Sequence, residues 1–510
     1  MTDGDFRSRA LVPAGAGPTT SRTARLRTLV ATLAVLGMVA TACGRSDDDP
    51  TASGDDATGE PTESTAPPTS PAGPAAGEFG DLGQVCGPAP AGATLTASDT
   101  GVTETSIQVG TIADPGFAGR PGLNQELFDS AEAFTKWCND AGGINGREID
   151  LKERDSKFTE HQARIIDACD EGDFMLVGGL GVIDDQGQSE RLACGLPSIS
   201  SATNPAAVEA DLAIMPVPSD LGSLSIGDLH WLAEKFPEAT QKIGFLTASM
   251  AVTITSAAKT KEAMAALGWE IVYDEQFNAA GEASWRGYVE GLKSAGVRGV
   301  IWGADPTNLA AVLNAMAEIE YHPDFVRAGG NSYDPVLIAE AGKAADGTYL
   351  MASNYPFLDP DIAKENLATQ QYLDIMAEYS PGGKIANLGV QGFSAWLLFA
   401  KAATACGADL TRDCVWESAD AIPDWTGGGL HARQDLANGR ASQCFVEIEV
   451  KDGEFMLSDI PTNEGVFNCD PKNSIDLEGD FGEERSVRIP RSLPIRSRRT
   501  ALSDRSEPSR

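Results

Sequence analysis

A run of small hydroxyl and amide residues follows a predicted strand and offers hydrogen-bond donors to an anionic group. Residues 197–200 read as a short buried strand, and Ser201, Ala202 and Thr203 come directly after it. Ligands of open parallel sheets bind at the carboxyl ends of the strands. Backbone N–H groups and hydroxyls at this point suit a carboxylate, particularly if a helix begins after Pro205. The alternative is a capped turn, because Ser, Thr and Asn before Pro are common turn residues.

A glycine-containing loop follows an earlier predicted strand, residues 174–178. Gly179 and Gly181 have the spacing of a dinucleotide-binding fingerprint, but Asp184 occupies the position of its third glycine. An acid at that position would face the pyrophosphate of the cofactor. We therefore interpret the loop as a turn whose glycines allow close approach of the backbone to another group, and not as a nucleotide site.

The sequence carries none of the standard catalytic or metal-binding motifs. It contains no GxxxxGK[ST], GxSxG, HExxH or acidic calcium loop. No CxxC pair occurs, and the four histidines are scattered along the chain. We therefore expect no catalytic residues, no metal ion and no cofactor.

The overall composition is that of a large globular protein with a strong negative charge. Its 510 residues are 42% apolar and 22% charged, so the length favours two packed domains and the composition argues against wholesale disorder. There are 39 Lys and Arg residues against 74 Asp and Glu residues, which gives a formal net charge of -35. Such a charge repels phosphate backbones, and nucleic acid is not an expected partner.

The N-terminus has the layout of an export signal. Arg22, Arg25 and Arg27 precede an apolar run over residues 29–40, which is shorter than the ~20 residues needed to span a bilayer. The tetrapeptide that ends at Cys43 resembles a bacterial lipobox, although its first residue is Ala where Leu is usual. Residues 1–42 are predicted to be a signal peptide and Cys43 a lipid anchor, with plain secretory cleavage nearby as the alternative.

Two segments outside the body of the chain are expected to be disordered. Residues 44–78 contain no Val, Leu, Ile, Met or aromatic residue and cannot form a core. We therefore assign residues 43–105 to a lipid-anchored tether. Residues 476–510 form a basic tail with little apolar patterning.

The cysteines that remain after Cys43 predict disulfides. An even number of cysteines in an exported chain indicates disulfide bonding, and their order along the chain favours neighbouring pairs. The predicted pairs are Cys169 with Cys194, Cys406 with Cys414 and Cys444 with Cys469, which leaves Cys86 and Cys138 to pair.

The body of the chain alternates between strand-like and helix-like periodicity. Apolar and polar residues alternate in residues 106–112, whereas residues 124–141 repeat their apolar positions every three or four residues. This alternation recurs through two successive sets and predicts an α/β protein with two doubly wound Rossmann-like lobes. The chain then crosses back, so the expected boundaries are 106–221 and 347–430 for lobe 1, and 222–346 and 431–475 for lobe 2.

Several short segments, in this order, resemble the leucine/isoleucine/valine-binding protein family. They are residues 139–149 with their GGINGR element, Asp155, residues 195–197, and residues 201–205 with their ATNP element. The resemblance extends from about residue 106 to residue 470. It implies the type I periplasmic binding protein fold, in which two lobes joined by three crossover segments close around a small solute and dock on an ABC permease.

The resemblance also implies site residues in each lobe. Ser201, Ala202 and Thr203 match the segment that holds the carboxylate of the solute, and Gly181 and Val182 lie near a position where the family often has Ser. In lobe 2, Asn331 stands near the acid that binds the ammonium group in the family, so that charge is missing. Asp305 is expected to replace it, with a helix cap before Pro306 as the alternative.

We therefore expect an extracytoplasmic solute-binding lipoprotein on the outer face of the cell membrane. Its partners would be a small amino-acid-like or amide-like solute with a carboxylate, an ABC permease, and the membrane through the lipid anchor, and the protein would be a monomer. A ligand-sensing receptor is the alternative. A secreted enzyme is a less favoured alternative, because the sequence contains no recognisable catalytic motif.

Overall fold

The computed structural model describes residues 75–202, 211–218, 221–436, 439–479 and 481. The chain divides into two compact units, residues 1–70 and 71–510, and all described residues belong to the second unit. The predicted signal peptide, Cys43, Thr203 and the basic tail from residue 482 onward lie outside the described residues.

Lobe 1 is built on a parallel five-stranded sheet. The strand order is β2-β1-β3-β4-β5, and every pairing is parallel, as the strand and helix alternation predicts. The strands are β1 (Ser106–Ala113), β2 (Glu148–Asp155), β3 (Met175–Val177), β4 (Ser198–Ile199) and β5 (Ala213–Ile214). The connecting helices are α1 (Gln125–Asp140), α2 (His161–Asp170) and α3 (Gln188–Ala193).

Lobe 2 is built on a larger mixed sheet with the path β13-β12-β11-β10-β9-β7-β8. Its parallel strands are β7 (Ile243–Ala248), β8 (Ile271–Phe277), β9 (Gly299–Gly303), β10 (Phe325–Gly329) and β11 (Thr348–Ala352), and β12 (Cys444–Lys451) and β13 (Glu454–Leu457) are antiparallel. Its helices are α5 (Gly227–Lys235), α6 (Ala251–Ala266), α7 (Arg286–Ser294), α8 (Pro306–Glu318) and α9 (Pro335–Ala341).

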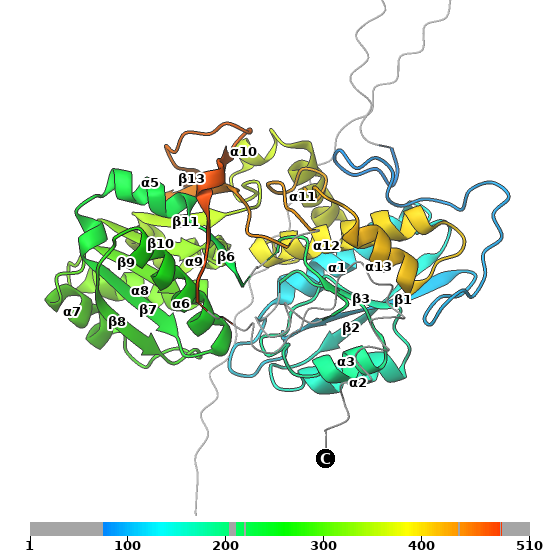
Figure 1. The fold of residues 1–510 in the computed structure, drawn as a ribbon, viewed down its shortest axis with the longest axis horizontal. Coiled ribbons are helices and arrows are strands. Elements are labelled where there is room, and N and C mark those ends of the chain that lie inside the picture. The colour runs from blue at the N-terminus through cyan, green and yellow to red at the C-terminus, as the bar shows by residue number, and fades with distance from the viewer. Residues whose placement is uncertain (1–74, 203–210, 219–220, 437–438, 480, 482–510) are drawn as a thin grey trace, which may run out of the picture. The chain divides into compact units, whose positions relative to one another are not determined.

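Distant parts of the chain return to each lobe (Figure 1). The late helices α11 (Leu367–Tyr379), α12 (Asn387–Cys406) and α13 (Arg412–Asp420) belong to lobe 1, where α11 and α12 pack on α1. The C-terminal strands β12 and β13 extend the lobe 2 sheet beside β11. The predicted crossing of the chain between two α/β lobes is therefore confirmed.

Two boundaries differ from the sequence-based expectation. β11 pairs with β10, so lobe 2 continues beyond residue 346 and the crossover follows Ala352. The second half of the expected tether is ordered, because Phe79, Val85 and Val102 are buried against lobe 1. The run without Val, Leu, Ile, Met or aromatic residues ends at residue 78. Burial of Phe79, Val85 and Val102 beyond it removes apolar surface from water and stabilises the folded state.

Three crossovers connect the lobes and contact one another. The first contains β6 (Ser223–Ser225), the second follows β11, and the third precedes β12. The N–H of Ala441 in the third crossover donates to Ser223 Oγ at 3.1 Å. Asn354 in the second forms an antiparallel bridge with His431 in the third. The connection between the lobes is therefore a hydrogen-bonded assembly and not three separate linkers.

Four disulfides fasten elements within the lobes, and they join the predicted cysteine pairs. Cys86 with Cys138 attaches the ordered N-terminal segment to α1. The remaining three join α2 to the end of α3, α12 to α13, and β12 to β14 (Asn468–Cys469). Each disulfide connects parts of the same lobe, so none of these four restrains the lobes against each other.

A buried charge cluster lies inside lobe 2. Glu447 on β12 and Asp228 on α5 are both fully buried, and Arg327 Nε donates to Asp228 Oδ2 at 2.5 Å. Neither carboxylate oxygen of Glu447 has a hydrogen-bond partner. Burial, together with the negative charge of Asp228, raises the pKa of Glu447 well above its ordinary value. Two acids share one arginine, so the folded protein holds a proton on Glu447 more tightly than the unfolded chain does.

We predict that Glu447→Gln becomes increasingly stabilising relative to the wild type as the pH rises. The raised pKa contributes stability that is fully present below the ordinary value of 4.5, and this contribution is lost as the pH rises through the folded-state pKa. Thermal unfolding from about pH 4 to pH 8 measures this difference. Glu449→Gln, a neighbouring partly exposed position on the same strand, is the control. Parallel curves for the wild type and Glu447→Gln would contradict the prediction.

Candidate functional site

The loops after β3 and β4 meet at the carboxyl edge of the lobe 1 sheet. The N–H and the hydroxyl of Ser201 both donate to Gly179 O, at 3.0 and 3.1 Å. This contact brings the segment that contains Gly181 and Val182 beside the segment that contains Ser201 and Ala202. The predicted lobe 1 residues that the structure describes therefore lie at one edge.

The donors of Ser201 serve the loop contact in this structure. Ser201 is fully buried, and its N–H and its hydroxyl hydrogen are both directed at Gly179 O. A hydroxyl oxygen keeps acceptor capacity when it donates, so Ser201 Oγ can still receive a hydrogen bond. Donors for an anion must then come from the residues that follow, and Thr203 is outside the described residues.

A buried carboxylate that the sequence analysis missed organises the same edge. Asp114 directly follows β1 and is fully buried. Its Oδ2 accepts from the N–H of Val182 at 2.8 Å, and its Oδ1 accepts from the N–H of Phe158 at 2.8 Å and from Ser156 Oγ. Three donors offset the cost of burying the charge. Asp114 therefore joins the loops after β1, β2 and β3. The sequence signal that could have identified it is an acidic residue directly after a predicted strand.

The glycine at 181 permits close contact with a buried histidine. A Cβ atom at this position would lie 2.1 Å from His161 Nδ1. Burial lowers the pKa of His161 to about 4, so its ring is neutral near pH 7. A cavity of about 40 Å³ lies beside both residues and is lined also by Arg191 and Ser200. That volume suits about one water molecule, so this cavity is too small for a solute.

Two aromatic rings stack at the same edge. Phe117 and Phe158 are half-buried, with ring centroids 4.6 Å apart and an interplanar angle of 23°. Phe158 has a φ of 74°, a left-handed conformation that is costly for a residue with a bulky side chain. Its hydrogen bond to Asp114 maintains this backbone geometry. An apolar surface is therefore held next to the loops of the predicted anion site.

Asp305 carries two structural roles at the facing edge of lobe 2. It is the N-cap of α8, where Oδ1 accepts from the N–H of Asn308 at 3.0 Å. The same Oδ1 lies 2.9 Å from Arg120 Nη2, and Arg120 is in the loop between β1 and α1 of lobe 1. The helix-cap alternative is therefore present, together with an ion pair between the lobes.

Two further polar contacts cross between the lobes. Asn387 Nδ2, at the start of α12 in lobe 1, donates to Asn331 Oδ1 in lobe 2 at 3.2 Å. Lys384 Nζ in lobe 1 lies 2.9 Å from Asp334, the N-cap of α9 in lobe 2, and 3.1 Å from Glu126. The three contacts Arg120–Asp305, Asn387–Asn331 and Lys384–Asp334 are called the interlobe seam below. Both predicted lobe 2 residues belong to it.

A larger cavity of about 230 Å³ lies where the three crossovers meet. Ser225, Ser353 and Ser442 contribute one side chain from each crossover, and Asn331 of the seam also lines it. Ser225 and Gln434 line the cavity, and Ser225 Oγ and Gln434 Oε1 are buried without a hydrogen-bond partner. The cavity, called the crossover cavity below, has room for a small polar group.

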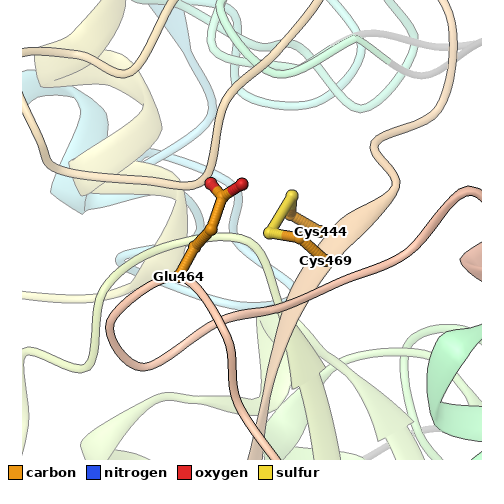
Figure 2. Close-up of side chains that lie close together, drawn as sticks. All are labelled: Cys444, Glu464 and Cys469. Atoms are coloured by element: carbon orange, nitrogen blue, oxygen red, sulfur yellow. A yellow bond between two sulfur atoms is a disulfide. The ribbon is translucent and has the colours of Figure 1, made fainter.

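The described residues include one cluster of potential metal ligands, and two of its members form a disulfide. Cys444, Glu464 and Cys469 place their ligand atoms within 4.8 Å of one another. Figure 2 shows that the two sulfur atoms are bonded to each other beside the Glu464 carboxylate. Cysteine binds a metal ion as a free thiolate, whereas Cys444 and Cys469 are joined in a disulfide. The described part of the chain also contains no helix long and apolar enough to cross a membrane.

Solved structures with the same architecture are solute-binding proteins. The fatty acid ABC transporter substrate-binding protein from Thermomonospora curvata is 17% identical with a TM-score of 0.60, covering 74% of this chain and 98% of that one. The leucine binding protein from Thermotoga maritima is 15% identical with a TM-score of 0.57, covering 69% and 97%. The isoleucine complex of a branched-chain amino acid transporter protein from Streptococcus pneumoniae is 14% identical with a TM-score of 0.57, covering 69% and 98%.

These identities show a shared fold. No curated protein matches the sequence significantly. The family model described as periplasmic binding protein matches residues 106–454, which is more than half of the chain and includes both lobes. This protein belongs to the periplasmic binding protein family.

Proposed function

We propose that this protein binds a small solute between its two lobes and delivers it to an ABC importer. The observation that carries the proposal is the interlobe seam, because residues at the facing edges of the two sheets meet there through polar side chains. A partly exposed ion pair such as Arg120–Asp305 is typically worth about 0–1 kcal/mol, so this contact can separate and re-form as the lobes open and close. The hydrogen-bonded crossovers provide the hinge for this movement.

The solute is proposed to carry a carboxylate or amide and an apolar part. Thr203 and the neighbouring N–H groups would hold the polar end at the carboxyl edge of β4, and Ser201 Oγ would accept from any donor on the solute. The stacked pair of Phe117 and Phe158 offers the apolar surface at the same edge. One structural neighbour is the substrate-binding protein of a fatty acid transporter and another is in complex with isoleucine, and both kinds of compound combine a carboxylate with an apolar chain.

Binding is favoured over turnover. An enzyme needs a nucleophile or base aimed at a reacting group. In the described part of the seam, Asp305, Asp334 and Lys384 are each engaged in ion pairs, and Asp114 accepts three hydrogen bonds. We therefore propose a non-enzymatic protein without a cofactor.

The proposed location is the outer face of the cell membrane. Cleavage before Cys43 and lipidation of its thiol would attach a monomeric protein to the membrane through the segment before residue 75, so that the lobes can reach a permease. This part of the proposal rests on the sequence of the first 43 residues, and the family membership agrees with an extracytoplasmic site.

We predict that a thermal-shift screen of amino acids, carboxylates, amides, ureas and sugars identifies a stabilising solute. A ligand present at about 100 times its dissociation constant adds about 2.7 kcal/mol to the folded state and raises Tm measurably. Isothermal calorimetry should then give one site per chain. Catalytic turnover of a compound without stoichiometric binding would contradict the transport proposal.

We predict that Thr203→Val weakens binding of the solute that this screen identifies by roughly 10- to 150-fold. Loss of one donor to a buried charged group typically costs about 1.5–3 kcal/mol. Thr159→Val, at an exposed position in the loop after β2, is the matched control and should leave affinity unchanged. An unaltered dissociation constant in Thr203→Val would place the polar end of the solute elsewhere.

We predict that Cys43→Ala releases the protein from the membrane fraction of expressing cells into the medium. The substitution removes the thiol that would carry the lipid, and the described residues include no membrane-spanning helix. Metabolic labelling with a fatty acid, followed by fractionation, measures both effects. Equal membrane retention and labelling of the two forms would refute the lipid anchor.

A further inference from the structure

The charge balance across the interlobe seam limits what a bound solute can carry. An ammonium group that enters a closing cleft loses its water, and this is costly unless an acid pairs with it. Two acids stand at the described lobe 2 edge, Asp305 and Asp334. Lobe 1 supplies Arg120 to Asp305 at 2.9 Å, whereas Lys384, at 2.9 Å from Asp334, is shared with the buried lobe 1 acid Glu126 at 3.1 Å. Both acids also cap helices.

Arg120 is placed to act on Asp305 alone. Its loop lies between β1 and α1, and its guanidinium reaches across to lobe 2 with 28% of the side chain exposed, against 20% for Asp305. Asp305 Oδ1 accepts from the Asn308 backbone, and Oδ2 accepts from Asn308 Nδ2 at 2.7 Å. Asn308 thus gives each oxygen a hydrogen-bond donor, and Arg120 supplies the positive charge that compensates Asp305.

The remaining described polar groups near the seam do not replace that acid. Asp114 is committed to three donors of its own lobe. Asn331 and Asn387 are neutral amides that bond to each other. The crossover cavity is lined by amides and hydroxyls, and the charged residue among its described lining is a cation, Lys259. Glu126 of lobe 1 is 4% exposed and pairs with Lys384, so its carboxylate has little surface to offer a solute. The described acids near Asp305 are therefore engaged by partners within the protein.

We propose that Arg120 determines the charge selectivity of the site: it occupies Asp305 in place of a ligand ammonium group, so that the preferred solute is an apolar carboxylate without an ammonium group. This inference rests on the proposed binding of a solute between the lobes. The apolar part of the solute would contact the stacked pair of Phe117 and Phe158. An α-amino acid would instead bring a cation to an edge whose described acids are already paired.

Matched ligand pairs test the proposal by calorimetry on the whole mature protein. The probes are 4-methylpentanoate with L-leucine and 3-phenylpropanoate with L-phenylalanine, because the members of each pair differ only by the α-ammonium group. The wild type is expected to bind at least one amine-free acid, and to bind it at least about tenfold more tightly than its partner amino acid.

Two variants separate charge selectivity from a merely structural role. In Arg120→Gln, Asp305 loses its cation and becomes available to the ligand, so the preference for the amine-free acid should fall by about tenfold or reverse. In the double variant with Asp305→Asn, the acid is absent as well and the wild-type preference should return. The control is Arg164→Gln, because Arg164 is also 28% exposed and pairs with Asp167 within α2, away from the seam. Its selectivity ratio should equal that of the wild type.

Three results would overturn the inference. The first is equal or tighter binding of the amino acids by the wild type, and the second is a selectivity ratio that Arg120→Gln leaves unchanged. The third is a failure of all four probes to bind. In each case, binding of any other solute in the broader screen would still support the proposed function, whereas the absence of every ligand would contradict that function itself.

Discussion

Each carboxylate at the facing edges of the two lobes must be compensated as water leaves the cleft, and the site is arranged around that requirement. In lobe 1, Asp114 is compensated locally by donors from two neighbouring loops. In lobe 2, Asp305 and Asp334 receive a helix N–H from their own lobe and a cation from the other. The first arrangement fixes loops within a lobe, and the second depends on how the lobes meet.

The two kinds of compensation differ in how easily they can be undone. Asp114 is fully buried, so removal of one of its donors would leave a desolvated charge partly unpaired. The seam cations are more exposed, with 28% of the Arg120 side chain and 37% of the Lys384 side chain accessible. Salt and water screen the Arg120–Asp305 pair, so its net contribution is small, whereas Asp334 beside Lys384 keeps only 5% of its side chain exposed. The contacts of Asp114 inside lobe 1 are therefore buried, whereas the Arg120–Asp305 contact between the lobes is partly exposed.

Like the contacts of Asp114, the four disulfides act within single lobes and not between them. Cys86–Cys138, Cys169–Cys194 and Cys406–Cys414 lie in lobe 1, and Cys444–Cys469 lies in lobe 2. They stabilise each lobe by restricting its unfolded chain, without a covalent link across the seam. The ordered segment from Phe79 to Val102 adds apolar burial to lobe 1 in the same way. The disulfides and this apolar burial thus stabilise the inside of each lobe, which agrees with the proposed opening and closing.

The sequence by itself determined the α/β lobes, because hydrophobic periodicity records which face of each strand and helix is buried. The order of the cysteines predicted the disulfide pairs that the structure confirms, and the strand pattern placed Ser201 after one strand and Val182 in the loop after another. The sequence analysis missed β11, because periodicity alone cannot assign so short an apolar run to a strand or a helix, and it missed the ordering of Phe79, which packs on the distant Phe393. Only the tertiary structure decided that Asp305 faces Arg120 and that Asp114 holds Val182, since these partners are 185 and 68 residues apart. Local patterns specify what a residue can bond to, whereas the packing of the lobes determines which partner is within reach.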